Sequence, residues 1–187
     1  MMMNTAGAFL VITCARPKKT TLRESGYNPS TKQTPSITLE HVYGKADHSM
    51  LRKKSLIGMP GIYVVVEDLG PELKGVVTRI DLRKRVELQL LTAGIRVIKK
   101  LEAAKLPGEP YLYLNIAALP LGPKRYACRI DLEVHQLVAL VHHSATGHAS
   151  TWEQGVVTTG GVQTIYDNVD ELVFDFICDY LAMNPKR

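Results

Sequence analysis

The chain lacks the motifs by which the commonest enzyme classes are recognised. It has no GxSxG sequence of a serine hydrolase, and it has neither a GxxxxGK[ST] nor a GxGxxG phosphate-binding loop. Its three cysteines form no CxxC pair, and no Cys/His spacing fits a zinc site. The sequence therefore assigns no catalytic residue, no metal and no cofactor.

Long apolar runs are also absent. The longest one near the start, residues 6–14, has about nine residues and is too short to cross a bilayer. It partly resembles an export signal, with Cys14 at the position of a lipidated cysteine. However, Arg16, Lys18 and Lys19 follow the run, whereas a signal peptide has its positive charge in front. The expected location is the periplasm or envelope if this segment, or an alternative start, is an export signal, and the cytoplasm otherwise.

Positive charge is concentrated in the first third of the chain. Residues 1–60 carry nine Lys or Arg and three Asp or Glu, for a net charge of +6, whereas residues 61–187 carry fourteen and fifteen, for a net charge of −1. Residues 16–54 are rich in Lys, Ser, Thr, Pro and Gly and show no periodicity. We therefore predict a basic, largely disordered leader over 1–54 and a single folded domain over 55–187. Nucleic-acid contact through the leader is an alternative that the nearly neutral domain does not favour.

The domain shows strand and helix patterns in alternation. A β-branched run predicts a strand over 61–69, and an apolar stripe predicts a helix over 77–93, which Gly94 ends. A short strand at 95–98 comes next. Further strands are expected at 111–118, 128–135 and 151–158, followed by a long final helix. This order predicts an α+β fold in which one mostly antiparallel sheet carries two helices on one face.

The final helix has a wide apolar stripe. Thr164 is expected to cap it, with Asp167 completing a capping box. Cys178 falls opposite the stripe and is expected to be exposed, whereas Cys128 is expected in the core, so we predict no disulfide between them. The stripe comprises Ile165, Val169, Leu172, Val173, Phe176, Ile177 and Tyr180. The solvated face is expected to comprise Asp167, Asp170, Glu171, Asp175 and Asp179.

Six sequence blocks together resemble an uncharacterised bacterial protein family whose members often carry a signal peptide. The blocks are PGIYVVVEDL, DLRKRVELQLLTAGIRV, PYLYLNIAAL, IDLEVHQLVALV, STWEQGVV and DELVFDFICDYLAMNP, which span about residues 55–185. The layout is more loosely similar to small α/β envelope domains such as the TolB amino-terminal domain. The resemblance implies an envelope location and no catalytic residue. The chain departs from the family by its long basic leader, which argues against that location here.

The clearest alternation in the chain indicates a sheet with one wet face. Residues 128–135 alternate apolar and polar side chains, which is typical of an antiparallel strand covered on one side only. We expect the polar face to carry exposed aromatic rings and to contact a partner protein of unknown identity. The candidate binding residues are Tyr111, Tyr113, Arg129, Glu133, His135 and Trp152.

A metal-dependent enzyme is the alternative from another functional class. It would use Glu133 and His135 together with the histidines of the loop over 142–150, namely His142, His143 and His148. Adjacent histidines on a strand point to opposite faces, and the loop spacing fits no usual ligand motif. The leading hypothesis is therefore a non-enzymatic interaction or accessory domain.

Overall fold

The computed structural model describes residues 48–140, 142 and 145–185. The chain divides into two units, Met1–Gly44 and Lys45–Arg187, and every described residue belongs to the second. No helix among the described residues is both long and apolar enough to cross a membrane.

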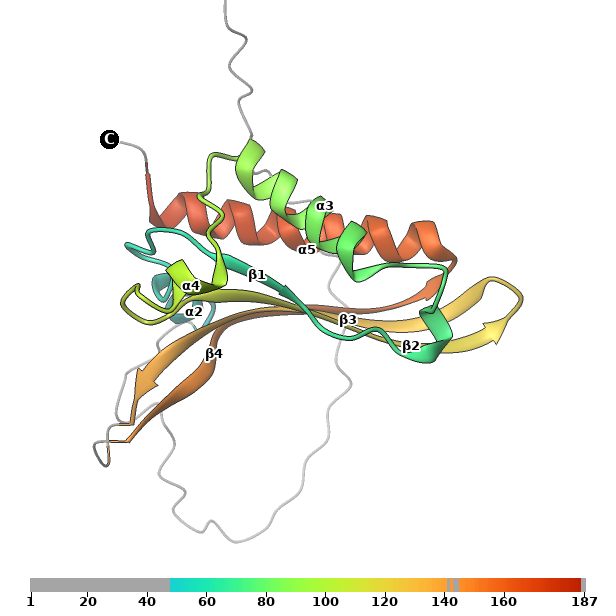
Figure 1. The fold of residues 1–187 in the computed structure, drawn as a ribbon, viewed down its shortest axis with the longest axis horizontal. Helices are drawn as coiled ribbons and strands as arrows, with labels where there is room; N and C mark the ends of the chain where they lie inside the picture. Colours follow the sequence, from blue (N-terminus) through green and yellow to red (C-terminus); the bar gives the residue numbers. More distant parts are fainter. Residues whose placement is uncertain (1–47, 141, 143–144, 186–187) are drawn as a thin grey trace, which may run out of the picture. The chain divides into compact units, whose positions relative to one another are not determined.

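The second unit contains four strands that form one sheet, two long helices and three shorter helical segments (Figure 1). The long helices are α3 (Arg79–Thr92) and α5 (Val162–Met183). In chain order the other elements are α2 (His48–Lys54), β1 (Tyr63–Val66), the 3-10 turn η1 (Pro71–Leu73), α4 (Lys100–Ala103), β2 (Tyr111–Gly122), β3 (Arg125–Ala139) and β4 (Thr146–Gly160).

The four strands lie in the order β1-β2-β3-β4. β1 runs parallel to β2, and the other two pairings are antiparallel. Figure 1 shows α3 and α5 side by side on one face of this sheet. The predicted α+β class and the two helices on one face are therefore confirmed.

The core lies between the sheet and the two long helices. Alternate residues of each strand point into it, as a pleated strand requires. β2 contributes Leu112 and Leu114, and β3 contributes Leu132, all of which are fully buried. The largest buried side chains are Trp152 from β4 and Phe176 from α5, whose rings meet edge to face with centroids 5.2 Å apart. The predicted inward placement of Cys128 is confirmed, and its thiol is free and buried.

The ends of α3 follow local chemistry. The Thr78 hydroxyl accepts a hydrogen bond from the Asp81 amide at 3.1 Å, which caps the amino terminus. Gly94 adopts a positive φ of 77° immediately after the C-cap, so the predicted glycine stop is confirmed. The predicted cap of the last helix is wrong, because α5 begins one turn earlier, after Gly161. Thr164 therefore lies inside the helix. The Asp167 carboxylate accepts a hydrogen bond from the side-chain amide of Gln163 instead.

The domain begins before residue 55. Helix α2 occupies part of the segment that the sequence indicates to be unfolded, and it packs against α5 and β4. Lys53 Nζ lies 2.7 Å from the Asp179 carboxylate, and the Trp152 indole N–H donates to the same group at 3.1 Å. The seven residues of α2 span too few turns for an apolar period to be visible in the sequence.

The last helix is less solvated than its acidic row indicates. Asp179 is buried with 6% of its surface exposed, and Asp170 is bound by Arg85 and Gln89 of α3. Cys178 is half-buried rather than exposed. The pattern of residues along α5 cannot reveal these neighbours, because they come from other elements.

Two connecting segments also differ from expectation. The predicted strand at 95–98 is reduced to one isolated bridge between Ile62 and Val97. The loop predicted over 142–150 is shorter, because β4 begins at Thr146 and includes His148.

Candidate functional site

We use the name outer face for the side of the sheet that points away from α3 and α5. The β2–β3 register pairs Tyr111 with His135 and Tyr113 with Glu133, and Arg129, four positions before Glu133 on β3, pairs with Ala117. Directly paired residues share a face of the sheet. Five of the six candidate binding residues therefore lie together on the outer face, as the alternation of β3 predicts.

Trp152 is the exception, and its predicted place on this face is wrong. It pairs with Val134, an inward residue of β3, and it is fully buried beneath α5. A β-bulge lies next to it, because Val134 pairs with Trp152 whereas His135 pairs with Ser150. The extra residue shifts the alternation of β4 by one position. This shift is not visible in the sequence.

A group of stacked rings occupies one part of the outer face. The Tyr111 and His135 rings are stacked, with centroids 5.0 Å apart and 10° between their planes. Tyr113 meets His135 edge-on at 5.6 Å, and His148 from β4 approaches Tyr111 at 5.7 Å. Three strands therefore contribute to one ring cluster, which is an amphipathic surface suited to contact.

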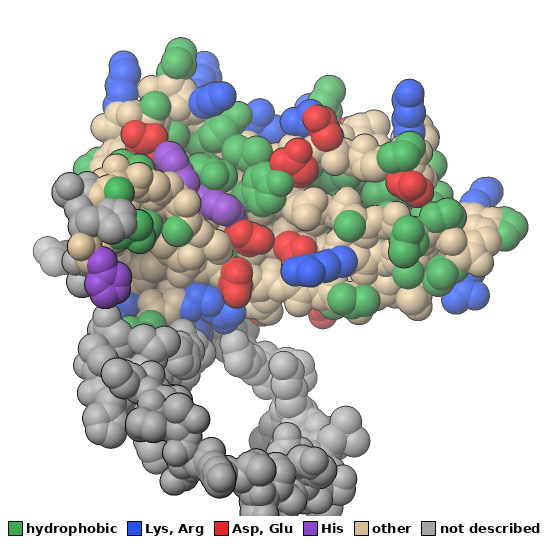
Figure 2. All heavy atoms as spheres, turned by 90° about the horizontal axis from the view of Figure 1, so that it is seen from below, with side chains coloured by type: hydrophobic (Ala, Val, Ile, Leu, Met, Phe, Trp, Pro, Cys, Tyr) green, Lys and Arg blue, Asp and Glu red, His purple; other side chains and the backbone are tan. Residues whose placement is uncertain are grey.

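Acidic side chains surround these rings. Glu133 pairs directly with Glu153 across β3 and β4, so two carboxylates are neighbours on the outer face. Asp131 lies two positions along β3, and Glu67 follows β1. Arg129 lies among them and is bound to Asp131 at 2.8 Å. Figure 2 shows Asp and Glu side chains close to histidine side chains on this face. The centre of the outer face is thus rich in negative charge.

Hydrogen bonds hold several of these groups in place. Glu133 Oε2 lies 2.8 Å from His135 Nε2. The Tyr113 hydroxyl donates to Glu67 Oε2 at 2.5 Å. This bond raises the pKa of Tyr113 to about 12 and lowers the pKa of Glu67, because it stabilises the neutral phenol and the ionised carboxylate together.

Replacing Tyr113 with phenylalanine is expected to raise the pKa of Glu67 towards its ordinary value. The lost hydrogen bond is the main cause of the lowered pKa, so the carboxylate becomes easier to protonate. Carboxyl ¹³C NMR over an acid titration measures this directly. Tyr63→Phe is the control, because Tyr63 has no hydrogen bond to Glu67, and a Glu67 pKa that is equal in both variants would contradict the assigned bond.

The alkaline limb of the stability curve tests the same bond from the other side. The folded-state pKa of Tyr113 is raised to about 12 above its ordinary value of 10. Its contribution is therefore complete below pH 10 and is lost as the pH rises through about 12. Tyr113→Phe should remove this part of the alkaline loss of stability.

The histidines do not converge on one point within the described residues. His135 is bound to Glu133, whereas His148 lies 3.6 Å from Glu109 in the loop before β2. His142 is exposed, and His143 lies outside the described residues. No group of three His, Cys, Asp or Glu side chains close enough to hold a metal ion occurs in the part of the chain that the structure describes. The described side chains therefore do not assemble the ligand set that the metal-enzyme alternative requires.

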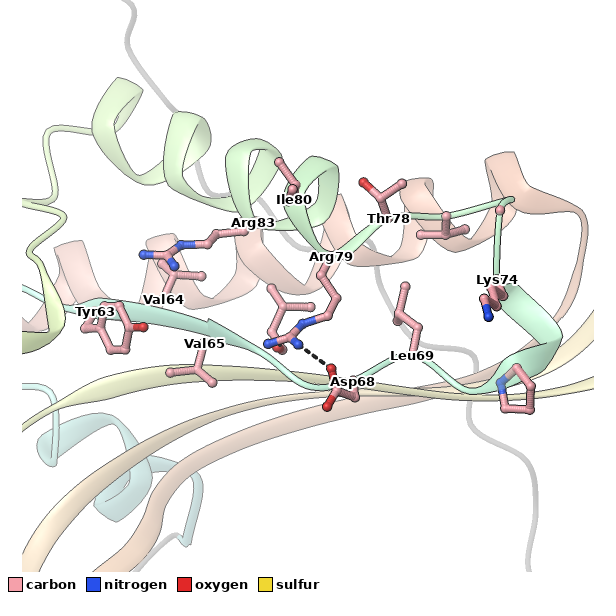
Figure 3. Close-up of a pocket in the computed structure, with 14 residues that line it drawn as sticks. Tyr63, Val64, Val65, Asp68, Leu69, Lys74, Thr78, Arg79, Ile80 and Arg83 are labelled. Atoms are coloured by element: carbon pink, nitrogen blue, oxygen red, sulfur yellow. Dashed lines mark hydrogen bonds and ion pairs between the residues drawn. The ribbon is translucent and has the colours of Figure 1, made fainter.

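A cavity of about 810 Å³ lies at the β1 edge of the sheet, between β1, η1 and the start of α3 (Figure 3). Two arginines of α3 extend across it. Arg79 donates to the Val66 carbonyl at 3.1 Å and pairs with Asp68, and Arg83 lies over the Tyr63 ring. The hydrogen bond of Arg83 with Glu87 raises the pKa of the guanidinium. Both arginines are thus engaged within the domain, and the cavity presents no convergent reactive groups.

No family model matches the chain, and no curated protein matches it significantly. The evidence on function therefore comes from the geometry of the described residues.

Sequence reasoning missed part of the outer face. Glu67, Glu153 and His148 all belong to it, but none is among the candidate binding residues: Glu67 and Glu153 lie within predicted strands, and His148 lies in a predicted loop. The near neighbours Tyr113 and Glu133 could have identified Glu67 and Glu153 once the strand order was known. That order depends on the parallel placement of β1 beside β2, which no local pattern reveals.

Proposed function

We propose that this domain is a non-enzymatic interaction domain that binds a protein partner through its outer face. The observation that carries the proposal is the facing pair of Glu133 and Glu153, beside a cluster of tyrosine and histidine rings. Like charges directly opposite each other across strands are destabilising. A face that keeps two facing carboxylates at its centre is suited to binding a positively charged surface that neutralises their repulsion.

The chemistry of the face favours a cationic partner surface. Carboxylates of Glu67, Glu133 and Glu153 can accept hydrogen bonds from Arg or Lys side chains. The rings of Tyr111 and Tyr113 offer π faces on which a guanidinium can stack. Half-buried polar groups with few apolar side chains fit a wet, reversible interface better than an obligate one.

The envelope is the proposed location of this interaction. The support is the resemblance of residues 55–185 to a bacterial family whose members often carry signal peptides. Fractionation of the native host tests it, since recovery of the chain with cytoplasmic markers alone would contradict an envelope location.

The test of the binding role uses charge removal without loss of shape. Glu133→Gln together with Glu153→Gln is expected to reduce recovery of partners from the native host by at least about tenfold, since two charge-assisted contacts of about 1 kcal/mol each are lost. The same variant is expected to unfold at a slightly higher temperature, because the like-charge pair contributes about 0.5 kcal/mol of repulsion.

The matched control is Glu171→Gln, an exposed carboxylate on α5. It changes the net charge in the same direction without altering the outer face. Unchanged recovery with the double variant, or an equal loss with the control, would contradict the proposal. Loss of recovery accompanied by a lower melting temperature would mean that the face is structural.

A further inference from the structure

The two edge strands of the sheet, β1 and β4, differ in how well other residues cover their free backbone groups. On the outer edge of β1, Ile62 bonds to Arg96 and Ile98, Arg79 bonds to the Val66 carbonyl, and Val64 is fully buried. The cavity of Figure 3 lies on this side, and arginines from α3 cross it. Covering an edge in this way is how monomeric sheet proteins prevent pairing with other chains.

Among the described residues, no such hydrogen bonds cover the free edge of β4 over its second half. The Glu153 carbonyl accepts a hydrogen bond from Arg52 at 2.5 Å, so it points away from β3. The pairing of β3 with β4 is regular from Trp152 to Gly160, and backbone direction alternates along a strand. The N–H and C=O groups of Gly155, Val157 and Thr159 therefore also point away from β3.

Gly155, Val157 and Thr159 are exposed, and their outward backbone groups have no partner among the residues that the structure describes. Val157 is 77% exposed, although it is a large apolar residue. Residues 154–161 contain no charged side chain and no proline, which are the usual devices that keep an edge strand from pairing.

We infer that this edge pairs with the same edge of a second copy of the chain, in antiparallel orientation with Val157 on the two-fold axis. The free segment runs from Gly155 to Thr159, because Arg52 already occupies the Glu153 carbonyl. Its centre is Val157. Only a register centred there matches Gly155 with Thr159 of the second copy and lets every free group pair.

The chemistry of the segment favours a second copy over a charged peptide. Two copies of an uncharged strand meet without like charges opposite each other, whereas an acidic or basic peptide finds no ion partner between residues 154 and 161. The two exposed Val157 side chains become neighbours and are removed from water. The result is one continuous sheet that places two outer faces side by side.

Sedimentation velocity of the full chain over a concentration series tests this inference. We expect a monomer–dimer equilibrium in the unmodified protein. Val157→Pro removes an outward N–H from each copy while leaving the hydrogen bonds of β4 to β3 in place. We expect it to raise the dimer dissociation constant by at least about tenfold.

Val157→Thr is the matched control, because it keeps the backbone donor and a β-branched side chain. We expect it to leave the dissociation constant within about threefold of the unmodified value, since valine and threonine are both strong strand formers. A monomer at every concentration would overturn the inference. So would a dimer that Val157→Pro leaves unchanged, because the contact would then lie elsewhere.

Hydrogen exchange of the unmodified protein gives a second measurement that needs no variant. The amides of Gly155, Val157 and Thr159 should become more protected as the concentration rises. Fast exchange at these amides in a dimer, or protection in a monomer, would overturn the inference. Either result would leave the outer-face proposal untouched, because that face lies perpendicular to the edge.

Discussion

Replacing Phe176 with alanine is expected to lower the free energy of unfolding by about 3–5 kcal/mol, as measured by urea denaturation. The ring is fully buried between the sheet and α5, and it contacts Trp152 edge to face and Tyr180 at 6.0 Å. Truncation therefore removes apolar contacts and leaves a cavity that the rigid sheet cannot fill.

The same helix provides a control with the same chemistry. Phe174 lies two residues earlier and is 42% exposed. Phe174→Ala is expected to cost less than about 1 kcal/mol, because surface changes away from the core have small effects. Equal losses at 174 and 176 would mean that the buried face of α5 is assigned wrongly.

Deletion of residues 1–54 is expected to destabilise the domain by about 3 kcal/mol relative to deletion of residues 1–44, because only the shorter deletion retains α2. The longer deletion removes α2, which supplies Lys53 to the buried Asp179 and places Arg52 over the Trp152 ring. A buried carboxylate that loses its cation is strongly destabilising.

Thermal unfolding of the two truncated chains measures the difference. Lys53→Met in the full chain is the control for charge loss alone, because it keeps most of the side-chain volume. A chain lacking 1–54 that melts like the chain lacking 1–44 would restore the domain boundary that the sequence indicates.

Periodicity predicted the parts of this fold in which one face of an element is wet. The stripe of Leu82, Val86 and Leu90 is buried, and the alternation around Glu133 is present in β3. Periodicity failed where residues from other elements determine whether a side chain is buried. Asp179 resembles a surface carboxylate in a row of acidic residues, yet an indole and a lysine from distant elements enclose it.

The candidate site was predictable in its centre but not at its margins. Tyr111, Tyr113, Arg129, Glu133 and His135 share one face because each obeys the period of its own strand. Additional acidic and histidine side chains join them only through the order of the four strands, which depends on long-range pairing. A single inserted residue in β4 reverses the side on which the tryptophan lies.

We propose that the outer face, rather than a pocket, contacts a cationic partner. The most direct measurement is an amide NMR titration of the full chain with an arginine-rich peptide at physiological salt. We expect shifts concentrated at Tyr113, Glu133 and Glu153, abolished by the double glutamine variant. Shifts centred instead on the exposed acidic residues of α5, or on the cavity beside Arg79, would contradict it.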